Sequence, residues 1–163
     1  MPAHRGVSAL QASIIASISV AVAIIASYWI WTMATSPLAA EKLKLTLPEV
    51  GLEGEYWVVR FKALNVGRVN TFITDLWLND KSILRLGDEA RAEVTVGGET
   101  YTWEGGSIVD SSGNEVSGVP LPVGEEAIVV IYVSADRYGP GQTLTISVIT
   151  AGNQVFKASV TLS

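Results

Sequence analysis

The chain has 163 residues, of which 48% are hydrophobic and 17% are charged, with a formal net charge of −5. It contains no cysteine, which excludes disulfides, thiolate catalysis and cysteine-rich metal sites. Its one histidine is His4, so the usual general base of hydrolases and the commonest zinc ligand are missing from the rest of the chain. We therefore expect no enzyme, no cofactor and no metal site. The acidic charge also disfavours nucleic acid as a partner.

The N-terminal part of the chain is a long uncharged segment. Residues 6–40 contain no Asp, Glu, Lys or Arg, and the run from Val7 to Met33 is apolar or small throughout. A helix of this length, at ~1.5 Å per residue, exceeds the ~30 Å hydrocarbon core of a bilayer. Since Pro37 cannot continue a helix, we predict a membrane-spanning helix over residues 7–36 and a linker over 37–42.

The flanks of this segment predict its orientation in a membrane. His4 and Arg5 precede the helix, and Glu41 is the first charged residue after it. Positive charge on the N-terminal side favours an N-terminus in the cytoplasm. Amphipathic aromatic side chains are then expected at the outer interface, and these are Tyr28, Trp29 and Trp31.

Residues 1–6, MPAHRG, form a short basic leader directly before the apolar run. A secretory signal peptide has a shorter apolar core, of ~7–15 residues, followed by a small-residue cleavage site. The leader instead resembles the class III signal peptide of type IV pilins and archaellins, which a prepilin peptidase cuts after the glycine. The resemblance implies cleavage between Gly6 and Val7, after Arg5, which would remove the leader and keep the helix.

Small residues recur at a spacing of four along the apolar segment. Such rows let helix backbones approach closely, as the core of a helical filament requires, whereas a single anchor in lipid has no need of them. The three rows are Ala12 and Ala16; Ser13, Ser17 and Ala21; and Ser19, Ala23 and Ser27.

Gln11 would be the fifth residue after the cut, where bacterial type IV pilins carry a glutamate that pairs with a neighbouring amino terminus. A glutamine can form a hydrogen bond there but cannot form the ion pair. The neutral residue is in keeping with an archaeal variant of the family.

Beyond residue 42 the pattern changes to the alternation that is typical of β-strands. The run from Ala127 to Val133 is almost continuously apolar, as in a strand that is buried on both faces or central in a sandwich. Gly97 and Gly98 form a two-residue hairpin turn, and a second hairpin turns at residues 151–154. The inward positions that we predict are Leu43, Leu45 and Leu47; Trp57, Val59, Phe61 and Ala63; Phe72, Thr74, Leu76 and Leu78; Ala92, Val94 and Val96; Leu144, Ile146 and Val148; and Phe156, Ala158, Val160 and Leu162.

About seven to nine short strands of this kind predict two packed sheets. The predicted fold class is mainly β with one long N-terminal α-helix, the head being an immunoglobulin-like antiparallel β-sandwich over residues 43–163. The strand order, the break at Asn65-Val-Gly67 and a closing hairpin at Gly139-Pro-Gly141 resemble the heads of archaeal pilins and archaellins. Residues 105–124 are rich in Gly, Ser, Asn and Pro and predict a surface loop or hairpin tip.

Two groups of residues in the head have side chains that could form a binding site. Asp110, Ser112 and Asn114 lack the bidentate glutamate of a calcium loop, so we expect a hydrogen-bonded turn. Three tryptophans could form a carbohydrate platform, but each lies in an alternating strand, so we expect core packing. These are Trp57, Trp77 and Trp103.

Together these features predict a structural subunit of an extracellular type IV pilus-like filament, with a head that is exposed for adhesion. Its expected partners are copies of itself, the prepilin peptidase, the pilus assembly machinery and, before assembly, the cytoplasmic membrane. Two alternatives stay open. The chain could be an archaellin of a motility filament, or a monomeric surface binding module anchored by its helix.

Overall fold

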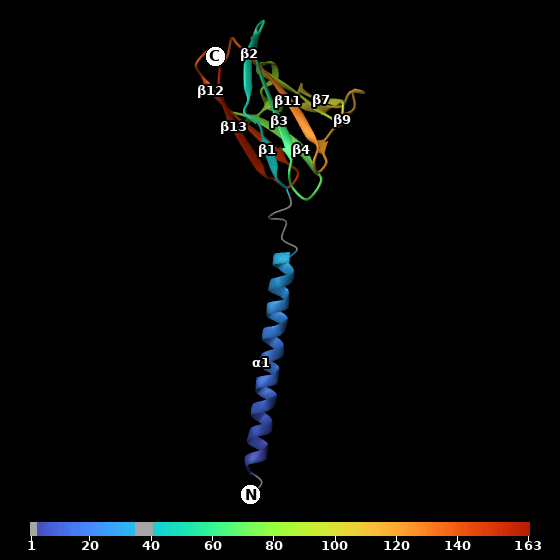
Figure 1. Ribbon diagram of the computed structural model, residues 1–163, viewed down its shortest axis with the longest axis vertical. Coiled ribbons are helices and arrows are strands. Elements are labelled where there is room, and N and C mark those ends of the chain that lie inside the picture. The colour runs from blue at the N-terminus through green and yellow to red at the C-terminus, as the bar shows by residue number, and fades with distance from the viewer. Residues whose placement is uncertain (1–2, 35–40) are drawn as a thin grey trace. The chain divides into compact units, whose positions relative to one another are not determined.

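The computed structural model describes the backbone of residues 3–34 and 41–163, and the side chains of residues 8–33 and 41–163. The chain divides into two compact units, residues 1–38 and residues 39–163. Figure 1 shows the first unit as a single helix and the second as an all-β head.

The helix α1 spans Ala3–Ala34. It begins four residues before the predicted start at residue 7 and ends two before the predicted end at residue 36. A single glycine costs a helix interior only about 1 kcal/mol, so Gly6 does not interrupt the backbone where the leader was expected to stop. The predicted stop at Pro37 and most of the predicted linker lie outside the described residues.

The larger sheet of the head has the strand order β1-β3-β11-β6-β7-β8-β9, and β2 also pairs with β3. All of these pairs are antiparallel. The strands are β1 (Leu43–Leu45), β2 (Glu49–Glu53), β3 (Tyr56–Asn65), β6 (Ala90–Val96), β7 (Glu99–Glu104), β8 (Ser107–Val109), β9 (Glu115–Val116) and β11 (Glu126–Ser134).

The smaller sheet has the order β10-β4-β12-β13, with β5 paired to β4, and it is also antiparallel. Its strands are β4 (Thr71–Leu78), β5 (Lys81–Ser82), β10 (Val119–Leu121), β12 (Thr143–Thr150) and β13 (Val155–Thr161). Two short 3₁₀ turns, η2 (Ile83–Arg85) and η3 (Gly87–Glu89), connect β5 to β6. The predicted class, one N-terminal helix followed by a mainly β, two-sheet sandwich, is confirmed.

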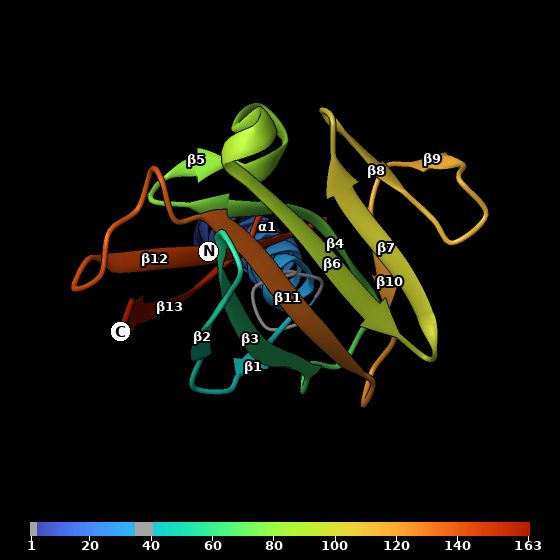
Figure 2. The ribbon, with the colours of Figure 1, turned by 90° about the horizontal axis from the view of Figure 1, so that it is seen from above.

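The apolar core lies between the two sheets, which Figure 2 shows from above. Trp103, Ile131 and Ile146 are fully buried there, and full burial of one large apolar side chain contributes roughly 1.5–3 kcal/mol. The predicted inward alternation is confirmed in β3 and β6, where Phe61 and Val94 are buried.

Both predicted hairpins are present. Val96 pairs with Glu99 across Gly97 and Gly98, whose φ angles of 60° and 86° fall in the region that glycine adopts without strain. In the second hairpin β12 and β13 pair as predicted, and the register places Leu144, Ile146 and Val148 opposite Val160, Ala158 and Phe156.

The predicted facing of β4 is wrong in its first half. Phe72 is 47% exposed, whereas Ile73 is fully buried, and Leu76 and Leu78 point inward as expected. The pairing between β4 and β12 skips one residue of β4: two consecutive residues of β12 pair with Asp75 and Ile73. Thr74 is therefore the extra residue of a β-bulge, which reverses the alternation between the two halves of the strand.

Strand β11 is central in the larger sheet, between β3 and β6, but it is not buried on both faces. Ala127, Val129, Ile131 and Val133 are fully buried, whereas Ile128 is 43% exposed. Of the two interpretations of this apolar run, the central strand of a sandwich is correct. The outer face of the larger sheet meets solvent.

The structure corrects two local expectations and decides between the alternatives of a third. Gly139-Pro-Gly141 does not close a hairpin, because it joins β11 and β12, which belong to different sheets. Residues 105–124, predicted to be a surface loop or hairpin tip, form a hairpin of the short strands β8 and β9, followed by β10. Leu47 lies beyond the end of β1 and is 90% exposed.

Candidate functional site

Every described side chain of α1, from Ser8 to Met33, is exposed in the single chain. This stretch of 26 residues has a mean hydropathy of 2.2 and is long and apolar enough to cross a membrane, although a signal sequence has the same properties. The predicted aromatic belt of Tyr28, Trp29 and Trp31 is exposed at the C-terminal end of the stretch. The helix therefore presents its whole apolar surface to its surroundings.

The surface of α1 has two unlike sides. At 3.6 residues per turn, two of the predicted rows fall on one side of the helix. Ile14, Ile18 and Ile25 project from the opposite side, and the row of Ser13, Ser17 and Ala21 lies between the two. The small-residue side comprises Ala12, Ala16, Ser19, Ala23 and Ser27.

Four hydroxyl groups of this helix, all on described residues, are bonded within it. Ser17, Ser19 and Ser27 each donate to the carbonyl oxygen four residues earlier, over 2.9, 2.9 and 2.7 Å, and Thr32 donates to the carbonyl of Trp29. A polar group that is already hydrogen-bonded can enter apolar surroundings at much lower cost. These side chains are therefore compatible with lipid or with a dry contact between helices.

The remaining predicted residues of this unit are placed only in part. Arg5, Gly6 and Val7 lie inside the backbone of α1, but their side chains are outside the described residues. Gln11 is exposed near the N-terminal end of the helix. Cleavage after Gly6 and the contact of Gln11 with a neighbouring chain thus stay predictions.

Glu41, at the start of the head, is a site that the sequence analysis missed. Its carboxylate accepts hydrogen bonds from the hydroxyl of Thr71 over 2.7 Å, from the hydroxyl of Thr150 and from the amide of Gly152 over 3.2 Å. Thr71 and Thr150 are 2% and 0% exposed. Thr71 begins β4, and Thr150 and Gly152 belong to the end of β12 and the turn after it. Glu41 is the first described residue of the head, and these bonds connect it to the smaller sheet.

The space beside Glu41 is closely matched to a glycine. A Cβ at position 152 would lie 2.5 Å from Glu41 Oε2, which is closer than van der Waals contact allows. Only one signal in the sequence pointed to Glu41, namely that it is the first charged residue after the apolar segment. Its partners are 30 and 109 residues away in the chain, so no local pattern could identify them.

The segment around Asp110 is a hydrogen-bonded turn, as expected. Asp110 Oδ1 accepts from the amides of Ser112 and Asn114, both over 2.9 Å. These bonds, chiefly the one from the Asn114 amide, lower the pKa of Asp110 below its ordinary value. Within the described residues there is no cluster of three acidic or histidine side chains that could hold a metal ion.

The three tryptophans of the head separate into two groups. Trp57 and Trp103 are 7% and 0% exposed and belong to the core, as predicted, and the Trp57 indole donates to the carbonyl of Tyr138 over 2.8 Å. Trp77 does not belong to the core, which corrects that prediction. Its neighbours in β4, Leu76 and Leu78, take the inward positions, so Trp77 lies on the outer face of the smaller sheet and is partly exposed.

Comparison with known proteins identifies no family. No family model matches the sequence, and no curated protein matches it. Among solved structures, the chain is similar to the archaellum periplasmic stator protein FlaG from Sulfolobus acidocaldarius. The sequence identity is 12% and the TM-score is 0.35, with 73% of this chain and 100% of that chain covered. A similarity at this TM-score does not show the function of this protein.

Proposed function

We propose that this chain is the structural subunit of an extracellular type IV pilus-like filament of the archaeal kind. In this proposal the α1 helices pack together in the filament core, and the β heads face outward, where they are available for adhesion. The observation that carries the proposal is the exposed apolar surface of α1, with small residues on one side and isoleucines on the other.

The two unlike sides support an open assembly. A helix whose small side receives the bulky side of the next copy makes a heterologous contact, in which different surfaces of identical chains meet. Such contacts build rings if the rotation closes and helical filaments if it does not. Close packing of Ala16 and Ala23 against isoleucines would replace lipid contacts with tighter dispersion contacts.

The precursor would be held in the cytoplasmic membrane by α1, with its N-terminus inside. The resemblance of residues 1–6 to a class III signal peptide supports cutting after Gly6 by a prepilin peptidase. The product would then pass to a pilus assembly machinery. A helix that is uncharged from Val7 onward, with the hydroxyls of Ser17, Ser19 and Ser27 bonded internally, suits both environments, because hydrogen-bonded polar groups enter lipid or a dry core at lower cost.

The packing model is tested by substitutions that change side-chain volume but not polarity. Ala16→Leu and Ala23→Leu each add bulk to the small-residue side while keeping the segment apolar enough to insert. We expect these variants to reach the membrane at the wild-type level and to form few or no filaments in electron micrographs, because an overpacked contact costs about 1–3 kcal/mol per subunit. The readouts are membrane-fraction immunoblots and filament counts.

The matched control is Ile15→Leu, a change in the same segment that conserves volume and is expected to leave filaments intact. Filaments of normal number and diameter from Ala16→Leu would contradict the packing model. In separate variants, Ala16→Asp or Ala23→Asp should abolish assembly altogether, because a lone charge in a dry core has no partner.

The mass of the native surface protein separates the filament from its rivals. Loss of residues 1–6, which leaves Val7 as the first residue, is expected for a filament subunit. A native protein that keeps Met1 and stays a single molecule would identify a helix-anchored binding module instead. If the processed chain assembles, swimming rather than attachment of the cells would identify an archaellin.

A further inference from the structure

The outer face of the smaller sheet carries a pocket that none of the roles above uses. Its volume is about 480 Å³, within the roughly 300–1,000 Å³ that is typical of small-ligand sites. It combines one aromatic ring, two carboxylates and two cations. The residues that line it are Asp75, Trp77, Asp80, Lys81, Ser82, Arg85 and Leu86.

A hydrogen bond to Asp75 fixes the orientation of the Trp77 ring. Its indole Nε1 donates to Asp75 Oδ2 over 2.7 Å, while Asp75 Oδ1 accepts from the Leu76 amide and from the Ser82 hydroxyl, both over 2.8 Å. Asp75 and Trp77, two residues apart in β4, project from the same outer face because Leu76 and Leu78 take the inward positions. An aromatic ring that is oriented in this way is a preorganised surface for stacking, with little side-chain entropy left to lose.

The two cations of the pocket are available to a ligand. Lys81 and Arg85 are exposed, and neither forms a salt bridge with any residue of 41–163. Asp80 is already paired, 3.6 Å from the ammonium of Lys157. The chain has 11 basic residues, one of which is Arg5, so the head holds 10 basic against 16 acidic residues. Two unpaired cations beside one ring in an acidic head indicate an anionic ligand.

We propose that this pocket binds an acidic oligosaccharide, namely a chain that contains uronic acid residues. One sugar ring lies against Trp77, its hydroxyls reach the polar rim, and its carboxylate is bound by the guanidinium of Arg85 and the ammonium of Lys81. A planar guanidinium binds a carboxylate through paired, charge-assisted hydrogen bonds. This proposal specifies the class of ligand to which the head would adhere, and it rests on the adhesive role in the proposed function.

The test measures binding to the full-length chain in detergent micelles by isothermal titration calorimetry. The acidic probe is the trisaccharide of galacturonic acid, and maltotriose is the neutral probe of equal length. We expect the acidic trisaccharide to bind at least about tenfold more tightly than the neutral one, because maltotriose has no carboxylate with which Lys81 and Arg85 could form charge-assisted hydrogen bonds.

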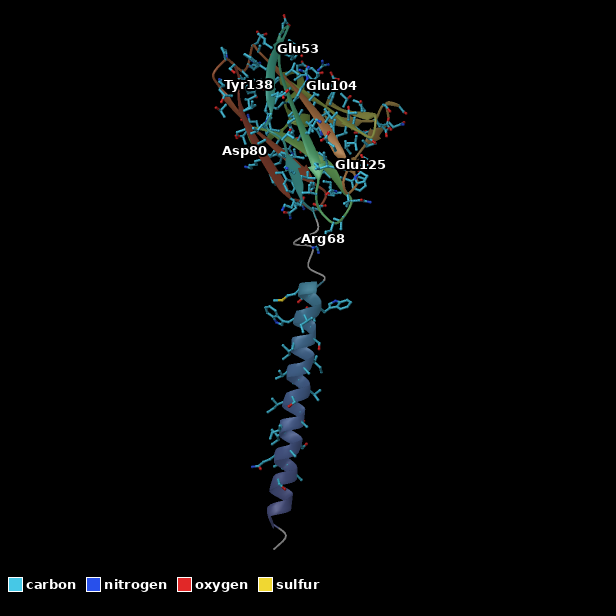
Figure 3. All side chains as sticks on the ribbon, in the orientation of Figure 1. Glu53, Arg68, Asp80, Glu104, Glu125 and Tyr138 are labelled. Carbon is cyan, nitrogen blue, oxygen red and sulfur yellow. The ribbon has the colours of Figure 1, made fainter. Side chains whose placement is uncertain are left out.

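Lys81→Gln combined with Arg85→Gln should weaken binding of the acidic trisaccharide at least about tenfold. The matched control is Lys44→Gln combined with Arg68→Gln, which removes the same charge from exposed positions elsewhere and should keep the wild-type affinity. Figure 3 labels Asp80, at the pocket, and Arg68, well away from it. Circular dichroism checks that both double variants are folded.

Four outcomes would overturn the proposal. They are no binding of the acidic trisaccharide, equal affinity for both probes, equal loss in both double variants, and displacement by inorganic phosphate at equal concentration, which would indicate a simple anion site. Loss of self-association in Lys81→Gln/Arg85→Gln without sugar binding would assign the pocket to a second copy of the chain instead. Filament assembly is scored separately, so Ala16→Leu should keep sugar binding even where it loses filaments.

Discussion

The helix and the head satisfy their apolar side chains in opposite ways. In the head, long-range strand pairing buries a core in which Trp103, Ile131 and Ile146 are fully hidden from solvent. In α1 no described side chain is buried, although the segment is the most apolar of the chain. The head therefore carries the basis of its stability within itself, whereas α1 depends on what surrounds it. The two regions should respond differently to the same kind of mutation.

A pair of tryptophan substitutions gives the largest expected contrast. Trp103→Ala removes a fully buried side chain and should lower the free energy of unfolding of the head by about 3–5 kcal/mol. Trp29→Ala removes a side chain that is 60% exposed on the helix and should leave that free energy unchanged. Urea unfolding followed by circular dichroism measures both in the full chain. A similar loss in the two variants would show that the helix and the head are energetically coupled.

The next contrast concerns the carboxylate at the start of the head. Glu41→Gln replaces one acceptor oxygen by a donor amide and leaves a bond from Thr71, Thr150 or Gly152 unmade. We expect a loss of about 1–3 kcal/mol in the free energy of unfolding. The control is Glu125→Gln, at an exposed carboxylate that Figure 3 labels, which should change stability little. Equal effects would mean that charge alone, and not these bonds, is responsible.

The smallest expected effect is a dependence on pH at Asp110. Because the pKa of Asp110 is lowered in the folded head, this carboxylate contributes stability above its ordinary pKa of 3.8. The contribution is lost as the pH falls through the lower, folded-state pKa. Asp110→Asn should therefore reduce stability slightly at about pH 7 and make it less sensitive to acid below about pH 4.

Asp136→Asn, at another exposed carboxylate, is the control for this experiment. Urea midpoints at neutral and acid pH measure both variants. If Asp110→Asn and Asp136→Asn show the same acid dependence as the unmodified chain, the hydrogen bonds at Asp110 contribute nothing to it.

Much of the fold was predictable because its signals are local. The uncharged run around Ala16, the alternation in β3 and the Gly97-Gly98 turn each depend on neighbours in the chain. The facing of Phe72 was not predictable, because it depends on a bulge in the pairing of β4 with β12, some 75 residues further on. The candidate sites divide in the same way. The rows on α1 follow from helical spacing, whereas the bonds of Glu41 join distant segments.

A lone carboxylate within an apolar strand, Asp75, was a signal that could have drawn attention to Trp77. Alternation alone places these two residues on one face of β4. It could not bring Lys81, Ser82 and Arg85 beside them, since that depends on how the chain turns after the strand.

The sequence by itself determined that this protein has an uncharged N-terminal helix and a β-rich, cysteine-free head, because composition and periodicity act over a few residues. Only the tertiary structure decided that residues 139–141 cross between sheets, that Glu41 binds to the smaller sheet and that Phe72 faces outward. Each of these depends on which strands become neighbours, and that choice is made by burying the whole core at once.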